Sequence, residues 1–248
     1  MKLIKKILAG AAIALAFGSA QATPVNVGGV YWDTDSPFDF NAYSLTERQT
    51  IAPDGSVSGY GSITTFNNST NFCSGCQLTF QFSGFKPTVF GASPTTPGQT
   101  IGYSGGVVNV YVSFAPSTII LGDPSSLNQT NTGLGTLFLG LTGHSYAGTT
   151  FNGTVNGNGT QLSGLSGTGQ LDATSGLALK YFDTNTQIDK SDIIFSNSFT
   201  QFLTPNNPAD SFGTGNFHGD TVAVPEPSSL ALFSIALLGA AFVRRRKQ

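Results

Sequence analysis

The segment LTFQFS, from Leu78 to Ser83, places an apolar side chain at every second position. Successive side chains of a β-strand point to opposite faces, so this alternation predicts a strand with one buried face. The segment from Val108 to Phe114 repeats the pattern, with apolar residues on one face and more polar residues on the other. No long segment has the period of an α-helix. The two segments therefore favour an all-β fold.

Further strands are expected where short apolar or alternating runs lie between turn-forming residues. The candidate strands are 57–66, 136–142, 151–155, 177–182 and 192–202, separated by clusters of Gly, Asn and Pro. Short strands with Gly-rich connections predict an antiparallel β-sandwich or jelly-roll-like single domain, which we place at residues 23–203. Disorder is the alternative for so Gly- and Ser-rich a chain, but the spaced Phe, Leu, Ile and Val residues can fill a core.

Three segments have the composition of irregular structure. Residues 92–106 and 152–169 are rich in turn-forming residues, and we expect loops there, although the Asn-Gly pairs of the second segment also suit a tight hairpin. Residues 204–224 are rich in Pro, Asn and Gly. They predict a linker that tethers the domain to a membrane.

The chain has two cysteines, Cys73 and Cys76, in the sequence FCSGC. A Cys-x-x-Cys pair can be redox-active in a βαβ setting, but the sequence shows no such setting. In an exported protein a local disulfide is the simpler interpretation, and it would fix the turn that leads into the strand at Leu78. Two cysteines cannot supply four ligands, and His144 and His218 lie in no matching motif, so we expect no metal site.

Acidic side chains that follow two aromatic residues form one candidate ligand site. Asp33, Asp35 and Asp39 come directly after Tyr31 and Trp32. Exposed aromatic rings beside carboxylates can hold a sugar or calcium. A solvated loop after a strand is the alternative interpretation.

A second acidic cluster, residues 183–192, has oxygen-bearing side chains at alternate positions, as a calcium loop does. It departs from an EF-hand, because Ile188 stands where the turn needs Gly and Ile194 stands where the bidentate Glu belongs. A polar turn without calcium is the alternative. We expect no cofactor.

Catalysis has little support in the sequence. His144 and His218 are the only histidines, and neither lies in a recognisable nucleophile motif. We therefore expect that the protein is not an enzyme. A secreted hydrolase would require one of the two histidines beside a carboxylate in a pocket.

The N-terminus has the pattern of a secretory signal peptide. Lysines precede an apolar run that ends at the cleavage motif Ala20-Gln21-Ala22. We expect residues 1–22 to form a signal helix that the Sec translocon and signal peptidase recognise. The mature chain would then begin near Thr23.

The C-terminus combines three features in a fixed order. They are Pro225-Glu226-Pro227, an apolar run at residues 228–243 and the basic cluster Arg244-Arg245-Arg246. The apolar run can enter lipid as a transmembrane helix, and the arginines then stay at the cytoplasmic face. This helix would be roughly 24 Å long at ~1.5 Å per residue, against a hydrocarbon core of about 30 Å. So short a span suits a temporary anchor.

This tail, residues 225–248, resembles the PEP-CTERM sorting signal of Gram-negative bacteria. The resemblance implies that a membrane-embedded exosortase recognises the tail, removes it near Pro225-Glu226-Pro227, and releases the protein from the inner membrane. The destination it implies is the cell surface or an extracellular polysaccharide matrix, with a role in a biofilm or floc. An ordinary C-terminal anchor with a chance Pro-Glu-Pro sequence is the alternative.

The charge balance changes once both ends are removed. Between Thr23 and Glu226 the chain has four basic and thirteen acidic residues, which gives a net charge near −9. Nucleic acids and anionic membrane surfaces need basic patches, so neither is an expected partner. We therefore expect an exported, non-enzymatic protein of the cell surface or extracellular matrix. The alternatives are a secreted carbohydrate-binding module and a secreted hydrolase.

Overall fold

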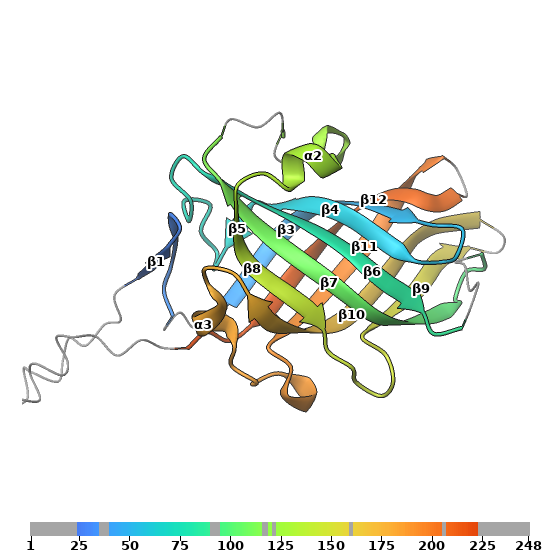
Figure 1. The fold of residues 1–248 in the computed structure, drawn as a ribbon. Helices are drawn as coiled ribbons and strands as arrows, with labels where there is room; N and C mark the ends of the chain where they lie inside the picture. The colour runs from blue at the N-terminus through green and yellow to red at the C-terminus, as the bar shows by residue number, and fades with distance from the viewer. Residues whose placement is uncertain are drawn as a thin grey trace, which may run out of the picture. The chain divides into compact units, whose positions relative to one another are not determined.

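Ten strands of the described residues pair in one antiparallel sheet that closes on itself (Figure 1). This computed structural model describes residues 24–34, 40–89, 95–115, 119–120, 123–158, 161–204 and 207–222. The strands of the sheet are β3 (Phe40–Ile51), β4 (Val57–Ile63), β5 (Thr65–Phe66), β6 (Gln77–Pro87), β7 (Thr100–Ser113), β8 (Thr136–Gly143), β9 (Phe151–Asn158), β10 (Gln161–Ser175), β11 (Ile193–Thr204) and β12 (Asn207–Gly219). Their order is β11-β12-β3-β4-β6-β7-β8-β10, and β10 pairs in turn with β11.

Strands β8 and β9 share one position in the closed sheet, between β7 and β10. β8 pairs with residues 107–112 of β7, and β9 pairs with residues 100–103 of the same strand. On the other side, β8 and β9 pair with successive parts of β10. The sheet therefore has eight strand positions and is barrel-like.

The predicted all-β antiparallel fold is confirmed, but the predicted sandwich or jelly roll is wrong in its layering. Two packed sheets would leave edge strands, whereas the pairing of β10 with β11 closes a single sheet. Alternation along a strand predicts which side chains are buried. It does not say whether they face a second sheet or the far wall of the same one.

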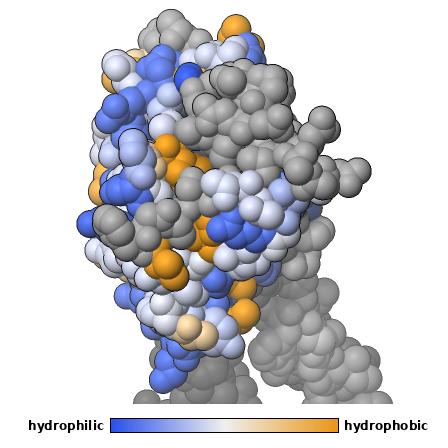
Figure 2. All heavy atoms as spheres, turned by 90° about the vertical axis from the view of Figure 1, so that its right-hand side faces the viewer, coloured by the Kyte–Doolittle hydropathy of each residue, from blue (hydrophilic) through white to orange (hydrophobic). Residues whose placement is uncertain are grey.

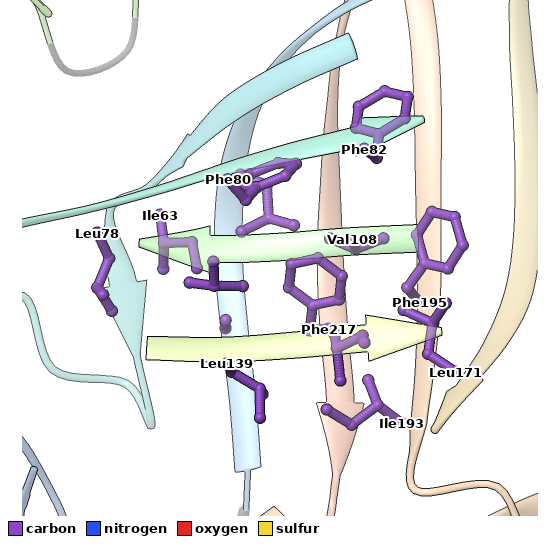
Figure 3. Packing of buried hydrophobic residues seen from close by; sticks show 14 of the residues in the cluster. Ile63, Leu78, Phe80, Phe82, Val108, Leu139, Leu171, Ile193, Phe195 and Phe217 are labelled. Atoms are coloured by element: carbon purple, nitrogen blue, oxygen red, sulfur yellow. The ribbon is translucent and has the colours of Figure 1, made fainter. Parts of the chain in front are cut away.

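Glycine and phenylalanine together fill the interior of the sheet. A Cβ atom on Gly61 would lie 2.3 Å from Phe80 Cζ, and one on Gly167 would lie 1.9 Å from Phe151 Cζ. Each glycine thus leaves the space that a neighbouring ring occupies. Figure 3 shows part of this packing, in which Phe80, Phe195 and Phe217 lie among aliphatic side chains. Seen from one end of the sheet, hydrophobic residues lie between hydrophilic ones (Figure 2).

The segment predicted as a linker, 204–224, contains β12, so that prediction is wrong. β12 pairs with β11 on one side and β3 on the other, and the compact unit of the chain extends from Val25 to Val222. The β domain therefore ends later than the predicted boundary at residue 203. The glycines of β12 allow close packing inside a strand. In the sequence, such a Gly-rich strand can be mistaken for a loop.

The two predicted loops, 92–106 and 152–169, are also largely strands in their described parts. β7 begins at Thr100, inside the first segment. β9 and β10 cover most of the second and pair as an antiparallel hairpin, the arrangement that its Asn-Gly pairs suit. Gly153 and Gly167 face each other in this hairpin, and Gly167 leaves the space that the Phe151 ring fills.

Short elements surround the closed sheet. β1 (Val25–Val27) and β2 (Val30–Trp32) form a separate two-stranded sheet within the described residues. The turn η1 (Pro124–Ser126) and helix α2 (Gln129–Thr132) contact β3, β4 and β6. There Thr79 Oγ1 donates to the carbonyl of Thr132 (2.6 Å). Helix α3 (Leu179–Phe182) and η2 (Ile188–Lys190) connect β10 to β11. The strand predicted at 177–182 is therefore wrong, because this segment forms a short helical turn that packs Phe182 into the core.

Among the described residues, no helix has both the length and the apolar character to cross a membrane. Three predictions concern segments outside these residues. They are the signal helix at 1–22, its cleavage site at Ala20, Ala22 and Thr23, and the transmembrane segment at 228–243. All three stay predictions.

Candidate functional site

A tight turn presents Tyr146 at the surface, in the segment that joins β8 to β9. The N–H of Tyr146 donates to the carbonyl of Thr149 (2.8 Å), and the N–H of Thr149 donates back to the carbonyl of Tyr146 (3.1 Å). Between them, Ala147 (φ 50°) and Gly148 (φ 86°) have left-handed backbone angles, as in the two-residue turns that join antiparallel strands. Tyr146 remains 48% exposed.

A cavity of about 160 Å³ lies beside this turn. The side chains that line it are Tyr146, Thr149, Thr150, Asn152, Thr168 and Gln170. They supply hydroxyl and carboxamide groups and one aromatic ring, and none of them is a charged type. The Oε1 atom of Gln170 is buried and has no hydrogen-bond partner in the described part of the chain.

Hydrogen bonds to the sheet hold the walls of the cavity. Thr150 Oγ1 donates to the carbonyl of Gly105 (2.7 Å), and the N–H of Gln170 donates to the carbonyl of Thr150 (3.0 Å). Asn152 Nδ2 donates to Thr149 Oγ1 (2.8 Å). The cavity lies where the chain leaves the sheet after β8 and returns as β9. Its walls are therefore fixed by strand pairing rather than by a free loop.

A histidine follows β8 at this point and lies between two carboxylates. His144 Nδ1 is 2.8 Å from Asp172 Oδ1, and Nε2 is 3.9 Å from Asp189 Oδ2. The backbone N–H of His144 donates to the backbone carbonyl of Gln170 (2.8 Å). The carboxylate that a hydrolase would require is thus present. Within the described residues, no hydroxyl or thiol is hydrogen-bonded to either ring nitrogen.

Polar side chains also lie inside the closed sheet, on three neighbouring strands. Glu47 and Gln49 on β3, Asn197 on β11 and Ser211 on β12 each have a buried polar atom without a partner among the described residues. Burial raises the pKa of Glu47 to about 8. The carboxyl is therefore mostly protonated at neutral pH.

The predicted ligand site at Tyr31, Trp32, Asp33 and Asp35 is not assembled as a surface site. Trp32 is 3% exposed. Its ring packs 5.3 Å from that of Tyr181 and 5.7 Å from that of Phe182, measured between centroids. β2 points Tyr31 outward and Trp32 into the core, since successive residues of a strand face opposite sides. Asp33 is exposed, and Asp35 lies outside the described residues.

The acidic segment 183–192 is a hydrogen-bonded loop in which one carboxylate binds backbone groups. Asp192 is 2% exposed and accepts the N–H groups of Ala173 (2.7 Å), Thr184 (2.8 Å) and Asn185 (2.6 Å). Across the described residues, no group of three or more His, Cys, Asp or Glu side chains is placed to hold a metal ion. The geometry of Asp192 therefore favours the polar turn over the calcium loop.

The structure joins Cys73 and Cys76, with Cα atoms 5.2 Å apart. Gly75, between them, has φ 71°, a left-handed angle that glycine adopts without strain. Cys73 also forms an isolated β-bridge with Val30 of β2. The turn from Cys73 to Cys76 therefore lies beside β2. It also precedes β6, the strand into which the disulfide was predicted to lead.

The comparison with known families decides the identity of the tail. Residues 223–247 match the family described as the PEP-CTERM protein-sorting motif. The chain carries a PEP-CTERM sorting motif. All six predicted sorting residues, Pro225, Glu226, Pro227, Arg244, Arg245 and Arg246, fall within the matched range. The motif marks an exported exosortase substrate with a transient membrane anchor.

The match covers the PEP-CTERM tail and not the barrel-like body. No curated protein and no solved structure showed a significant similarity to the chain. The body is therefore interpreted from its own geometry. The residues of the PEP-CTERM motif lie outside the described residues, so the motif is identified from the sequence alone.

Proposed function

We propose that the protein is a non-enzymatic component of the cell surface or extracellular matrix, released from the inner membrane by an exosortase. One observation carries the proposal. The compact unit ends at Val222, and the PEP-CTERM match begins at residue 223. Its last strand, β12, ends at Gly219. Removal of the tail near Pro225-Glu226-Pro227 would leave every described strand of the closed sheet in place.

The proposed route has three steps. The signal peptide at residues 1–22 directs the chain to the Sec translocon, and signal peptidase cuts before Thr23. The segment 228–243 then holds the protein in the inner membrane for a limited time, with the arginine cluster on the cytoplasmic side. Exosortase cleavage releases the folded body to the cell surface or matrix, where we propose a role in a biofilm or floc.

The geometry around His144 supports a non-enzymatic role. Its ring nitrogens face Asp172 and Asp189, and a hydrolase that works through a Ser, Thr or Cys nucleophile needs a hydroxyl or thiol at one of them. His218, on β12, is exposed. A strongly acidic body also supports an extracellular setting, because a net charge far from zero keeps a protein soluble.

Mass spectrometry of the C-terminal peptide tests the proposal. The protein is isolated from the surface and culture fractions of its exporting host. A C-terminus near Pro225-Glu226-Pro227, without the segment 228–248, is the expected result. An intact Gln248 on all membrane-bound protein would contradict it, and the tail would then be a plain anchor.

A matched pair of variants shows whether the motif directs the cut. Changing Pro225 and Pro227 together to alanine is expected to leave the tail uncut and the protein in the membrane fraction. Changing Ser228 and Ser229 to alanine, directly beside the motif, should leave processing unchanged. Equal processing of both variants would remove the role that we assign to Pro-Glu-Pro.

A further inference from the structure

We propose that the cavity beside Tyr146 binds one unit of a neutral polysaccharide. This inference rests on the proposed function, because delivery to the matrix brings the cavity to such a polymer. The site is distinct from the predicted one at Tyr31 and Trp32, whose indole ring is buried. It is also distinct from the PEP-CTERM tail.

The chemistry of the walls points to a sugar. A sugar ring has an apolar face and a rim of hydroxyl groups, so it suits a wall with one aromatic ring and several neutral hydrogen-bonding groups. Tyr146 supplies the ring, and Asn152 and Gln170 supply carboxamides that both donate and accept. Thr168 adds an exposed hydroxyl. This combination fits a polyol better than a purely apolar ligand.

The absence of charged side chains from the cavity wall selects a neutral ligand. The charges next to it belong to Asp172 and Asp189, which flank His144. The body as a whole has thirteen acidic and four basic residues. An anionic polymer would meet repulsion from this field and would find no cation in the wall. A neutral sugar would not be repelled by this field and would need no cation in the wall.

Gln170 gives an independent indication that the cavity takes a polar occupant. Gln170 is 9% exposed, and its Oε1 atom has no hydrogen-bond partner among the described residues. A buried acceptor without a donor destabilises a protein, so such groups are rare. Gln170 lies in the cavity wall, while its Oε1 atom is turned away from solvent. A rotation of the carboxamide would turn this acceptor toward a sugar hydroxyl, which would satisfy it.

The size of the cavity limits the occupant to about one ring. A volume of about 160 Å³ far exceeds the space that one water molecule needs. It is smaller than the pockets of roughly 300–1,000 Å³ that enclose drug-sized ligands. A single sugar unit, with the rest of its chain along the surface, matches this size.

The site is also preformed. The paired hydrogen bonds between Tyr146 and Thr149 fix the turn, and Asn152 is held by its bond to Thr149. A wall that is ordered before binding loses little conformational entropy on binding.

Calorimetric titration of the protein, isolated as its host exports it, tests the site. The probes are maltotriose, cellotriose and triacetylchitotriose as neutral sugars, and polygalacturonate as an anionic comparison. We expect at least one neutral trisaccharide to bind and polygalacturonate not to bind. Binding of polygalacturonate alone, or of no probe, would overturn the proposal.

Two tyrosines of nearly equal exposure form a matched control pair. Tyr146→Ala is expected to lower the affinity for the bound trisaccharide roughly tenfold or more. Tyr31→Ala, at a residue that is 47% exposed against 48% for Tyr146, should leave it unchanged. Loss of binding in Tyr31→Ala, or full binding in Tyr146→Ala, would place the site elsewhere and overturn the assignment.

A second variant keeps the test valid if Tyr146→Ala disturbs the turn. Thr168→Arg adds a long side chain to an exposed position in the cavity wall and should abolish binding by occupying the space. Unchanged binding in this variant would contradict the proposal. The mass of the C-terminal peptide is measured on the same samples. Correct processing without sugar binding would refute only the site and leave the proposed function intact.

Discussion

Gly153 on β9 and Gly167 on β10 lie opposite each other in the antiparallel register, but only Gly153 has room for a methyl group. A Cβ atom on Gly167 would lie 1.9 Å from Phe151 Cζ. The nearest atom to a Cβ on Gly153 is Phe151 Cε1, at an ordinary contact distance of 3.4 Å. Two glycines that look equivalent in the sequence therefore have different roles in the packing of the interior.

This difference predicts opposite outcomes for two alanine substitutions. Gly167→Ala should lower the free energy of unfolding by about 1–3 kcal/mol, because the Phe151 ring has to move. Gly153→Ala should change it by less than about 1 kcal/mol, and the reduced entropy of the unfolded chain favours a small gain. Denaturant unfolding followed by circular dichroism measures both. Equal losses in the two variants would contradict the close-packing role of Gly167.

The buried carboxyl of Glu47 makes stability depend on pH. Burial raises its pKa from 4.5 to about 8 in the folded protein. The folded state therefore binds the proton more tightly, so the contribution of Glu47 is largest below about pH 4.5 and falls as the pH rises toward 8. The fall is about 1.4 kcal/mol per pH unit at most. Unfolding free energies measured between pH 5 and 9 should show this loss.

Glu47→Gln is expected to remove most of that slope, because an amide does not ionise. Asp54→Asn is the control at an exposed carboxyl, whose pKa is lowered by its hydrogen bonds from Ser56. It should leave the slope between pH 5 and 9 unchanged. A Glu47→Gln variant with the same slope as the unchanged protein would show that another group titrates.

The bond between Cys73 and Cys76 is expected to protect both thiols from alkylation until the protein is reduced. Loss of a cross-link that closes so short a loop costs about 2 kcal/mol in the chain-entropy account. The double change of Cys73 and Cys76 to serine should therefore lower the midpoint of thermal unfolding. Mass spectrometry after alkylation, with and without reductant, checks the bond. Two freely alkylated thiols in exported, unreduced protein would refute it.

Trp32 is expected to act as a core residue rather than as a ligand. Trp32→Ala should lower the free energy of unfolding by about 3–5 kcal/mol, since it leaves a cavity among Tyr181, Phe182 and Phe138. Tyr31→Ala, at the exposed neighbouring position, should change it by about 0.5 kcal/mol or less. Circular dichroism during denaturation measures both. Equal effects would show that β2 does not orient the two side chains as described.

The sequence predicts the β class well because the alternation at 78–83 and 108–114 is strong. Residues 78–83 lie inside the long strand β6, and residues 108–113 lie inside β7, which ends one residue before Phe114. The sequence fails at 152–169 and 204–224 because their glycines look like turn residues. In the structure Gly167, Gly169 and Gly215 lie against side chains of neighbouring strands, a relationship between distant residues that no local pattern contains.

The candidate site was not predictable for a related reason. Its cavity forms where β8 gives way to β9 beside β10, so its walls come from a change of strand pairing. The turn that presents Tyr146 has Ala-Gly at its centre, and the usual signal for such a turn is Asn-Gly or Asp-Gly. By contrast, Pro225-Glu226-Pro227 and the arginine cluster form a local pattern. That is why the sorting motif could be predicted from the sequence and was confirmed.

The position of β12 has a consequence for the timing of folding. β12 is the last of the described strands to be synthesised, yet it lies between β11 and β3, and its register joins Gly219 to Phe40. Contacts between such distant parts of a chain form slowly. On the proposed route, the body cannot close until nearly all of it has left the translocon, when the tail itself reaches the membrane. Until then the edges of β3 and β11 stay unpaired. A periplasmic chaperone that covers these edges would prevent them from pairing with other chains.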